Sequence, residues 1–445
     1  MNIFMTVEVA SRELESRALL AAYATQHGFD VFLGRKKETI DRALVSAPGI
    51  FLSQWGLHRN FRELYKKLKA LGHVIICLDE EGLVTLGFEH YVITKVDTQC
   101  VALVDKVLLW GNSQERAFKS KFPAYSSKFE AVGNPRDDIL HDRFECLFFN
   151  EKNNDDNRGL APITFVSSFG FANHVMGGEL YFKKSIKNGV FFNEHVRSIF
   201  TDYFYFQTKN FKKFVDLAKA SANLFPERII IYRFHPSENR ENLIQELAEY
   251  RNIRFSFGGS LIPLLRKSVI VVHNYCHAGI EAQILGKKTI AFRPERNPEI
   301  EDERVYSYSK SISEEHEALS IIEKHQLSIE QNNSDIKQIP SADFIYRADD
   351  ELASERITII FKKFSEIGFR KRGRYLMIAK ARLVAMVKSF RTVKDHYIDQ
   401  KSEGLNYKAV RNIIDKISLV EPRAGGHIYI KEISPYVFKL TQSRK

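Results

Sequence analysis

The sequence predicts an α/β protein built on parallel sheets of the doubly wound kind. Three observations support this fold class. Short apolar runs alternate with segments of helical periodicity, a complete βαβ unit lies at residues 269–294, and a polar stretch divides the chain into two such halves. With 445 residues, of which 44% are hydrophobic, the chain is long enough to fill the cores of two or three domains.

The βαβ unit is the clearest part of the pattern. Residues 269–272 are all β-branched and favour a buried strand, residues 278–285 have helical spacing, and Gly286 is suited to end that helix. Ligands of open α/β sheets bind at the carboxyl ends of the strands, so the polar turn between strand and helix is a candidate ligand site. The polar side chains of this turn and of the helix after it are His273, Asn274, His277 and Glu281.

The first 150 residues contain predicted strands separated by predicted helices. An amphipathic helix starts near Ser11, whose hydroxyl can cap its N-terminus, and a further helix is predicted at residues 61–70. This alternation indicates a parallel sheet with crossover helices. The predicted strands cover residues 3–9, 30–33, 49–53, 74–78 and 106–110.

A polar segment at residues 151–162 predicts a domain boundary. We expect an N-terminal Rossmann-like domain at residues 1–150 and a second one at residues 160–345. Residues 346–445 are predicted to form a basic helical extension that packs on the N-terminal domain or on a membrane surface. Within it, the stretch from Phe369 to Arg391 is basic and amphipathic, which suits both an anionic membrane surface and a packed helix with a solvated basic face.

The composition restricts the partner and the compartment. A net charge of +11 and a pI near 9.2 predict an acidic partner, which can be nucleic acid, an anionic membrane surface or a phosphate-bearing substrate. The four cysteines are far apart, which argues against a disulfide framework or a zinc site. No signal peptide is visible, and no apolar run approaches the ~18 residues that span a bilayer. We expect a cytoplasmic protein without metal or cofactor.

Three consecutive carboxylates follow the predicted strand at residues 74–78. Asp79, Glu80 and Glu81 precede Gly82, at a strand end where an α/β sheet opens into a crevice. Buried carboxylates in such a cluster raise one another's pKa and can serve in acid–base catalysis. A solvated acidic turn closed by the glycine explains the same residues, so both interpretations stay open.

Three further turns offer contacts to an anion. Ser167 and Ser168 lie in a Ser/Gly turn after a strand, where backbone amides can hold a phosphate. His235 ends a buried strand and is stiffened by Pro236, so it can donate to a phosphate or to a leaving group. Arg136 follows a Gly-Asn-Pro turn suited to the same task. Structural turns use the same residues, and this interpretation stays open for each of them.

Six motifs carry a resemblance that extends over residues 1–294. They lie at residues 79–83, 107–111, 132–140, 166–169, 233–236 and 273–294. In this order they resemble bacterial surface carbohydrate biosynthesis proteins of GT-B glycosyltransferase form, which implies two Rossmann-like domains facing a cleft. The His-Pro motif followed by the Gly-Ile-Glu-Ala helix is similar to sialyltransferases, capsule Kdo transferases and teichoic-acid polyol-phosphate transferases, all of which use cytidine-nucleotide donors.

The resemblance implies a role for each motif. The second domain would hold a CMP-linked donor, with His235 on its phosphate and the turn from His273 through Gly279 to Glu281 on phosphate and ribose. A carboxylate such as Glu281 can accept both ribose hydroxyls. The acidic turn resembles the Asp-Gly turn of capsule β-Kdo transferases, although this chain has Glu81 in place of Asp. Glu80 or Glu81 would be the general base of an inverting enzyme or the nucleophile of a retaining one.

We therefore predict a glycosyltransferase that moves a sugar, such as the acidic sugar Kdo, from a CMP-linked donor to a surface polysaccharide or its lipid-linked precursor. Arg12, Arg136 and Arg293 are candidates to bind a donor carboxylate or phosphate. A CDP-polyol phosphotransferase of teichoic-acid type would use the same His-Pro site. A non-catalytic module that binds RNA or an anionic membrane through its basic C-terminal part is a second alternative. Nucleic-acid binders normally interleave aromatic and basic residues, so we expect no nucleic-acid partner.

Overall fold

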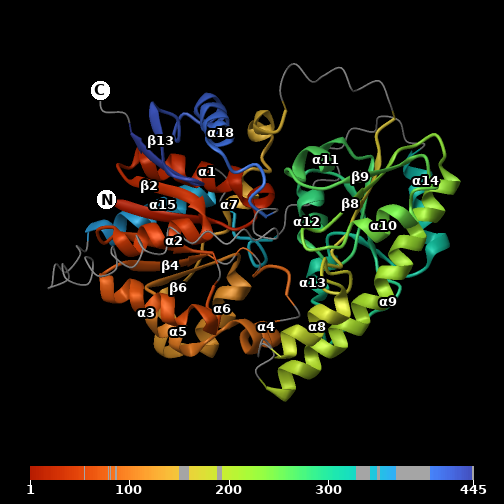
Figure 1. The fold of residues 1–445 in the computed structure, drawn as a ribbon, viewed down its shortest axis with the longest axis horizontal. Helices are drawn as coiled ribbons and strands as arrows, with labels where there is room; N and C mark the ends of the chain where they lie inside the picture. The colour runs from red at the N-terminus through yellow and green to blue at the C-terminus, as the bar shows by residue number, and fades with distance from the viewer. Residues whose placement is uncertain are drawn as a thin grey trace. The chain divides into compact units, whose positions relative to one another are not determined.

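The computed structural model describes residues 1–54, 56–78, 80, 82–85, 88–149, 160–187, 193–326, 341–347, 351–366 and 401–442. The chain divides into two units (Figure 1). The first unit comprises residues 1–83, 94–148 and 341–445, and the second comprises residues 84–93 and 149–340. Each unit contains a sheet with parallel strands and crossover helices, which confirms the predicted α/β class with two Rossmann-like domains.

The first unit is built on an eight-stranded sheet of order β13-β14-β2-β1-β3-β4-β5-β6. Strands β1 to β6 run parallel, whereas β13 and β14 are antiparallel additions beside β2. The parallel strands are short apolar runs that are largely buried on both faces, as is usual between layers of crossover helices. The strands are β1 (Asn2–Val7), β2 (Asp30–Arg35), β3 (Ile50–Ser53), β4 (Val74–Leu78), β5 (Lys106–Leu109), β6 (Phe129–Ala131), β13 (Ile428–Ser434) and β14 (Val437–Gln442).

Two groups of helices belong to this unit. Helix α1 packs against α15 and α18, and α3 packs against α2 and α5. Helix α1 starts after Val9, so the predicted Ser11 cap is wrong. The Glu13 carboxylate caps the helix by accepting hydrogen bonds from the backbone N–H groups of Glu8 (2.9 Å) and Val9 (3.3 Å). The helices are α1 (Ala10–Gln26), α2 (Lys36–Val45), α3 (Arg62–Leu71), α5 (Thr98–Leu103), α6 (Asn112–Lys121), α7 (Pro135–Asp138), α15 (Ala353–Glu366) and α18 (Tyr407–Val420).

The C-terminal residues complete the first unit. The prediction of a helical extension is only partly correct, because β13 and β14 form a hairpin that joins the sheet at β2. Gly34 of β2 permits this approach, since a Cβ at that position would lie 2.3 Å from the carbonyl oxygen of Tyr436. The basic stretch from Phe369 to Arg391 lies outside the described residues, so its predicted membrane contact stays a prediction.

Helix α15 is tied to the loop after β6. The buried Asp138 carboxylate accepts hydrogen bonds from the backbone N–H groups of Ala353 and Ser354, both at 2.8 Å, and from the Ser354 hydroxyl at 2.7 Å. Burial raises the pKa of Asp138 to about 6, although these hydrogen bonds act to lower it. Its neighbour Asp137 forms an ion pair with Arg347. The two aspartates of the Gly-Asn-Pro-Arg-Asp-Asp motif therefore hold the C-terminal segment in place.

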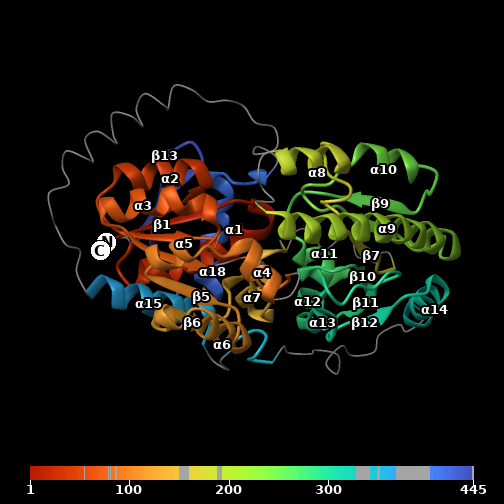
Figure 2. The same ribbon diagram turned by 90° about the horizontal axis from the view of Figure 1, so that it is seen from below.

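The second unit is built on a six-stranded, fully parallel sheet of order β12-β11-β10-β7-β8-β9. Its core includes the fully buried rings of Phe165, Phe214 and Tyr232. The predicted βαβ unit is confirmed as β10, α12 and β11 (Figure 2). The strands are β7 (Ile163–Val166), β8 (Ile230–Arg233), β9 (Ile253–Ser256), β10 (Ile270–His273), β11 (Lys288–Phe292) and β12 (Lys310–Ile312).

The helices of the second unit include the aromatic segment that precedes β8. That segment forms α8 and the long α9, which begins after Asn193, whose side chain accepts a hydrogen bond from the Val196 N–H at 2.8 Å. Among the described residues, no helix has both the length and the apolar character needed to cross a membrane. The helices are α8 (Gly178–Lys187), α9 (Glu194–Leu224), α10 (Glu241–Glu246), α11 (Ile262–Lys267), α12 (His277–Ile284), α13 (Glu303–Tyr306) and α14 (Glu315–Gln326), with most of α4 (Phe88–Lys95) in the same unit.

Candidate functional site

Three neighbouring strands of the second unit end at the same edge of its sheet. Strands β10, β7 and β8 lie side by side and run parallel, with His273 paired to Val166 and Val166 paired to Arg233. The predicted Ser167–Ser168 turn, the His235–Pro236 turn and the turn before α12 therefore leave the sheet next to one another. The carboxyl edge of a parallel sheet is the usual place for a ligand in this fold class.

The turn after β7 is held by a residue that the sequence patterns did not reveal. The Glu238 carboxylate accepts hydrogen bonds from the Ser167 hydroxyl and from the Phe169 backbone N–H, both at 2.7 Å and both on Oε1. The backbone of His235 hydrogen-bonds the same carboxylate. Glu238 is 1% exposed, and this burial raises its pKa to about 7 even though the hydrogen bonds act in the opposite direction. Glu238 thus joins the two turns that follow β7 and β8.

His235 is oriented by the residues of its own turn. Its Nδ1 accepts a hydrogen bond from the Ser237 backbone N–H at 3.2 Å and lies 2.7 Å from the Ser237 hydroxyl. A neutral imidazole with Nδ1 as acceptor carries its proton on Nε2, which makes Nε2 the donor. Gly170 packs against this turn, because a Cβ there would lie 2.0 Å from Ser237 Oγ and 2.7 Å from His235 Nδ1. The two turns therefore meet at a position where only glycine fits.

His273 lies beneath the turn that leads into α12. Its side chain is fully buried, its Nδ1 donates to the Asn274 carbonyl oxygen, and its Nε2 lies 2.8 Å from Ser309 Oγ. Desolvation lowers the pKa of His273 to about 4, so the ring is neutral at physiological pH. A Cβ on Gly279 would lie 2.2 Å from His273 Cε1, so α12 packs directly on the ring. This geometry favours a supporting role for His273 and Gly279 over the predicted direct contact with a donor.

The remaining residues of the turn lie closer to the sheet edge. Asn274 is 6% exposed, and its Oδ1 has no hydrogen-bond partner in the described part of the chain. His277 and Glu281 are half-buried in the first two turns of α12. The Ser168 hydroxyl donates to the Tyr275 carbonyl oxygen at 3.5 Å, a long hydrogen bond that brings the first and third turns together. The predicted donor residues of the second unit are therefore gathered at one edge of its sheet.

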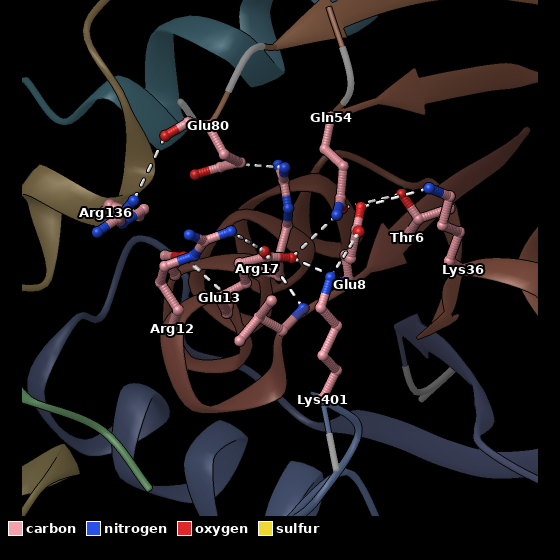
Figure 3. A network of polar contacts seen from close by, with 12 residues as sticks. Thr6, Glu8, Arg12, Glu13, Arg17, Lys36, Gln54, Glu80, Arg136 and Lys401 are labelled. Atoms are coloured by element: carbon pink, nitrogen blue, oxygen red, sulfur yellow. Dashed lines mark hydrogen bonds and ion pairs between the residues drawn. The ribbon is translucent and has the colours of Figure 1, made fainter. Parts of the chain in front are cut away.

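The first unit has a polar network at the carboxyl ends of β1, β3 and β4 (Figure 3). Glu80 follows β4 and is 3% exposed, and its Oε1 lies 2.6 Å from Nη2 of Arg17, which is equally buried on α1. Arg136 Nη1 lies 3.4 Å from the Glu80 carbonyl oxygen, so this predicted donor residue belongs to the first unit. Asp79 and Glu81 lie outside the described residues, and their catalytic roles stay predictions.

A second buried carboxylate, Glu13, belongs to the same network. Besides capping α1, Glu13 accepts hydrogen bonds from Arg12 (3.3 Å) and from the Gln54 side-chain amide (3.1 Å), whose oxygen in turn accepts from the Thr6 hydroxyl. Burial raises the pKa of Glu13, Arg12 acts against this effect, and the charge of Glu80 adds to it. The signal in the sequence was a Glu and an Arg four residues apart, at the start of the helix that follows the first strand.

The network has unused hydrogen-bonding capacity. Nε and Nη1 of Arg17 and Oε2 of Glu80 are buried without a hydrogen-bond partner among the described residues. The buried carboxylates of Glu13 and Glu80, which lie near the Arg17 guanidinium, can exchange a proton with a bound hydroxyl group. Arg293, which was predicted to bind a carboxylate or phosphate of the sugar donor, forms ion pairs with Glu301 (3.0 Å) and Glu303 (2.7 Å).

Comparisons with known proteins identify the fold. No protein-family model matches the chain, and neither does any curated protein sequence. Solved structures do match. A Listeria monocytogenes protein described as a UDP-N-acetylglucosamine 2-epimerase has a TM-score of 0.52 at 12% identity, over 83% of this chain and 97% of that chain.

Two structures of the Methanocaldococcus jannaschii UDP-GlcNAc 2-epimerase are similarly related. One has a TM-score of 0.51 at 11% identity, over 82% of this chain and 100% of that chain. The other, in complex with UDP-GlcNAc and UDP, has a TM-score of 0.50 at 12% identity, over 81% of this chain and 99% of that chain. At this identity the likeness establishes the fold, a GT-B-like pair of Rossmann-like domains. The narrower resemblance to capsule Kdo transferases is not shown by these structures.

Proposed function

We propose that the chain is a nucleotide-sugar-dependent glycosyltransferase that builds a bacterial surface polysaccharide. In this proposal it moves an acidic sugar such as Kdo from a CMP-linked donor to the polysaccharide or to its lipid-linked precursor. The observation that carries the proposal is the convergence of three polar turns at the carboxyl ends of β10, β7 and β8. A nucleotide phosphate needs several N–H donors at one place, and turns at the carboxyl edge of a parallel sheet are a usual source of them.

The donor phosphate would be bound by groups from all three turns. The proton on His235 Nε2 makes this histidine a hydrogen-bond donor, and Gly170 lets the turn after β7 lie directly against the His235 and Ser237 side chains. The N-terminus of α12 adds a favourable dipole. Asn274 Oδ1 is a buried acceptor without a hydrogen-bond partner among the described residues, so it would accept from a hydroxyl or amino group of the donor, and Glu281 would accept the ribose hydroxyls.

The chemistry would come from the carboxylates of the first unit. Glu80 would take the proton of the acceptor hydroxyl in an inverting reaction, or attack the anomeric carbon in a retaining one. Arg17 holds Oε1 of Glu80 and leaves Oε2 for the reacting group. The Glu80→Gln substitution should therefore abolish sugar transfer while leaving CMP binding intact. Full transfer activity in this variant would count against the mechanism.

Nucleotide binding is tested by thermal shift with CMP, CDP, UDP and GDP. CMP at a hundredfold excess over its dissociation constant should stabilise the protein by about 2.7 kcal/mol, because a ligand that binds only the folded state shifts unfolding by mass action. His235→Ala should remove most of this shift. His316→Ala is the matched control, since His316 is exposed on α14 of the same unit. If no nucleotide stabilises the protein, the proposal fails.

The same screen separates this proposal from other enzymes. Stabilisation by CDP with no response to CMP would favour a CDP-polyol phosphotransferase, which needs the phosphate site but no anomeric carboxylate. Stabilisation by UDP alone would favour an enzyme that acts on a UDP-sugar. The structurally similar epimerases are named for such a sugar, UDP-GlcNAc. Each outcome would replace the CMP-linked donor of the proposal.

A further inference from the structure

Helix α8 and the loop before it expose an unusual number of aliphatic side chains. Val175, Met176 and Leu180 are 42%, 45% and 49% exposed and lie within six residues of one another. Single exposed aliphatic residues are ordinary on a protein surface, whereas a local group of them marks a surface that another molecule covers.

The opposite side of α8 is fixed against the rest of the second unit. The Phe182 ring stacks on Phe204 of α9 with 5.1 Å between ring centroids, and the Tyr181 ring stacks on His174 at 3.8 Å. Figure 2 shows α8 alongside α9. These contacts determine which face of α8 points to solvent.

The outward face of α8 is basic. Lys183, Lys184 and Lys187 follow Leu180 at positions i+3, i+4 and i+7, which is the spacing of a single helical face, and all four side chains are exposed. The helix therefore presents Leu180 and three ammonium groups, of which that of Lys183 is paired with the exposed Glu179 carboxylate at 3.5 Å. The exposed Val175 and Met176 lie in the loop just before it. We call these six residues the α8 face: Val175, Met176, Leu180, Lys183, Lys184 and Lys187.

The α8 face is directly connected to the candidate donor site. The Val175 backbone N–H donates to the Ser237 carbonyl oxygen at 2.8 Å, and the Asn239 N–H donates to the Asn173 carbonyl oxygen at 2.8 Å. Ser237 is also the residue that orients His235. The loop that presents Val175 and Met176 is thus bonded to the turn that contains His235.

We propose that the α8 face docks on the surface of an anionic membrane. Its aliphatic side chains would enter the headgroup region while the lysine stems lie along it and their ammonium groups meet lipid phosphates. The net charge of +11 adds long-range attraction. A nucleic acid is a poorer fit, because the face has no exposed aromatic ring on which a base could stack. Docking would bring the His235 turn to the membrane, and this inference does not depend on which nucleotide that turn binds.

The test is sedimentation of the full chain with phospholipid vesicles. We expect binding to vesicles of phosphatidylcholine and phosphatidylglycerol in equal parts, and much weaker binding to phosphatidylcholine alone. The triple variant Lys183→Gln, Lys184→Gln, Lys187→Gln should lower the partition coefficient about 100-fold. This value follows from about 1 kcal/mol per lysine at an anionic surface, with 1.4 kcal/mol for each factor of ten.

The matched control neutralises three exposed lysines of the first unit. Lys66, Lys67 and Lys119 are exposed there, so their triple replacement by glutamine changes the net charge equally. It should keep most of the binding. The variant Met176→Ser, Leu180→Ser should also bind more weakly, because it removes the apolar part of the face.

Three results would overturn the docking proposal. They are no wild-type binding to anionic vesicles, equal losses in the two triple variants, and full binding by the α8-face variant. The last result would point to another surface of the protein. Thermal shift with CMP should be unchanged by the three α8 substitutions, so a failure of docking and a failure of nucleotide binding are told apart.

Discussion

The substitution Glu238→Gln tests how the donor edge of the second unit is held together. Glu238 is buried, accepts hydrogen bonds from Ser167 and Phe169 through Oε1, and has no partner for Oε2 among the described residues. Burial raises its pKa from the usual 4.5 to about 7. Glutamine keeps the shape and one acceptor oxygen but cannot ionise.

The expected effect depends on pH. Because the folded-state pKa is raised, the stability contributed by the protonated acid is fully present below pH 4.5 and is lost as pH rises to about 7. A shift of about 2.5 units at 1.36 kcal/mol per unit corresponds to about 3 kcal/mol. The free energy of unfolding of the wild type should therefore fall by about 3 kcal/mol relative to Glu238→Gln between pH 4.5 and pH 7.5.

The measurement must report on the second unit by itself, because the chain has two units and need not unfold in one step. Native-state hydrogen exchange of the backbone amides of β7 and β8, corrected for the intrinsic pH dependence of exchange, does so. Glu249→Gln is the matched control, since Glu249 is exposed in the same unit. Parallel pH curves for wild type and Glu238→Gln would refute the reasoning, as would a wild type that gains stability relative to the variant as pH rises.

Three further substitutions test other parts of the structure. Gly279→Ala should lower the melting temperature and cost about 1–3 kcal/mol, because its Cβ would overlap the buried His273 ring; a neutral result would contradict the close packing of α12. Asp138→Ala should cost about 1–3 kcal/mol and selectively increase hydrogen exchange at the start of α15, and unchanged protection there would show that α15 is held by other contacts. Arg17→Met should lower the free energy of denaturant unfolding by about 3–5 kcal/mol, because it leaves the buried Glu80 carboxylate without its ion-pair partner. The double variant Arg17→Met, Glu80→Met should recover most of that loss. Equal losses in the single and double variants would argue against a buried ion pair.

Much of the second unit was predictable because its pattern is local. Residues 269–272 were expected as a strand and residues 278–285 as a helix, and the structure has β10 (Ile270–His273) and α12 (His277–Ile284) there. Fully buried parallel strands appear as uninterrupted β-branched runs, and a glycine ends the helix between them. Such signals need no knowledge of distant residues.

The C-terminal hairpin was missed for a physical reason. β13 (Ile428–Ser434) and β14 (Val437–Gln442) form one edge of the sheet, so part of their side chains face solvent and the apolar pattern is diluted by charge. The helical pattern of residues 349–364 and the basic, amphipathic pattern of residues 369–391 favoured a helical interpretation. The hairpin pairs with β2 around Gly34, which is far away in sequence, so no local pattern reveals where it joins the sheet.

The turns of the candidate site were predicted from the sequence, but the buried carboxylates that hold them in place were not. Ser167, His235 and Glu80 follow strands and could be picked out individually. Glu238 does not directly follow a strand, and its partners Ser167 and Phe169 lie far from it in the sequence. Glu13 has a local signal in Arg17, but its hydrogen bond to Gln54 joins segments 41 residues apart. Burial of a carboxylate is a property of the assembled fold, so the raised pKa of these two residues could not be predicted from local sequence.

The central claim is that a cytidine nucleotide binds at the carboxyl edge of the second sheet. Hydrogen–deuterium exchange with and without CMP tests this claim directly, because it reports both binding and location. The account predicts slower exchange at residues 167–170, 234–238 and 273–281, and no such protection in His235→Ala. Protection confined to other segments, or none at saturating CMP, would contradict it.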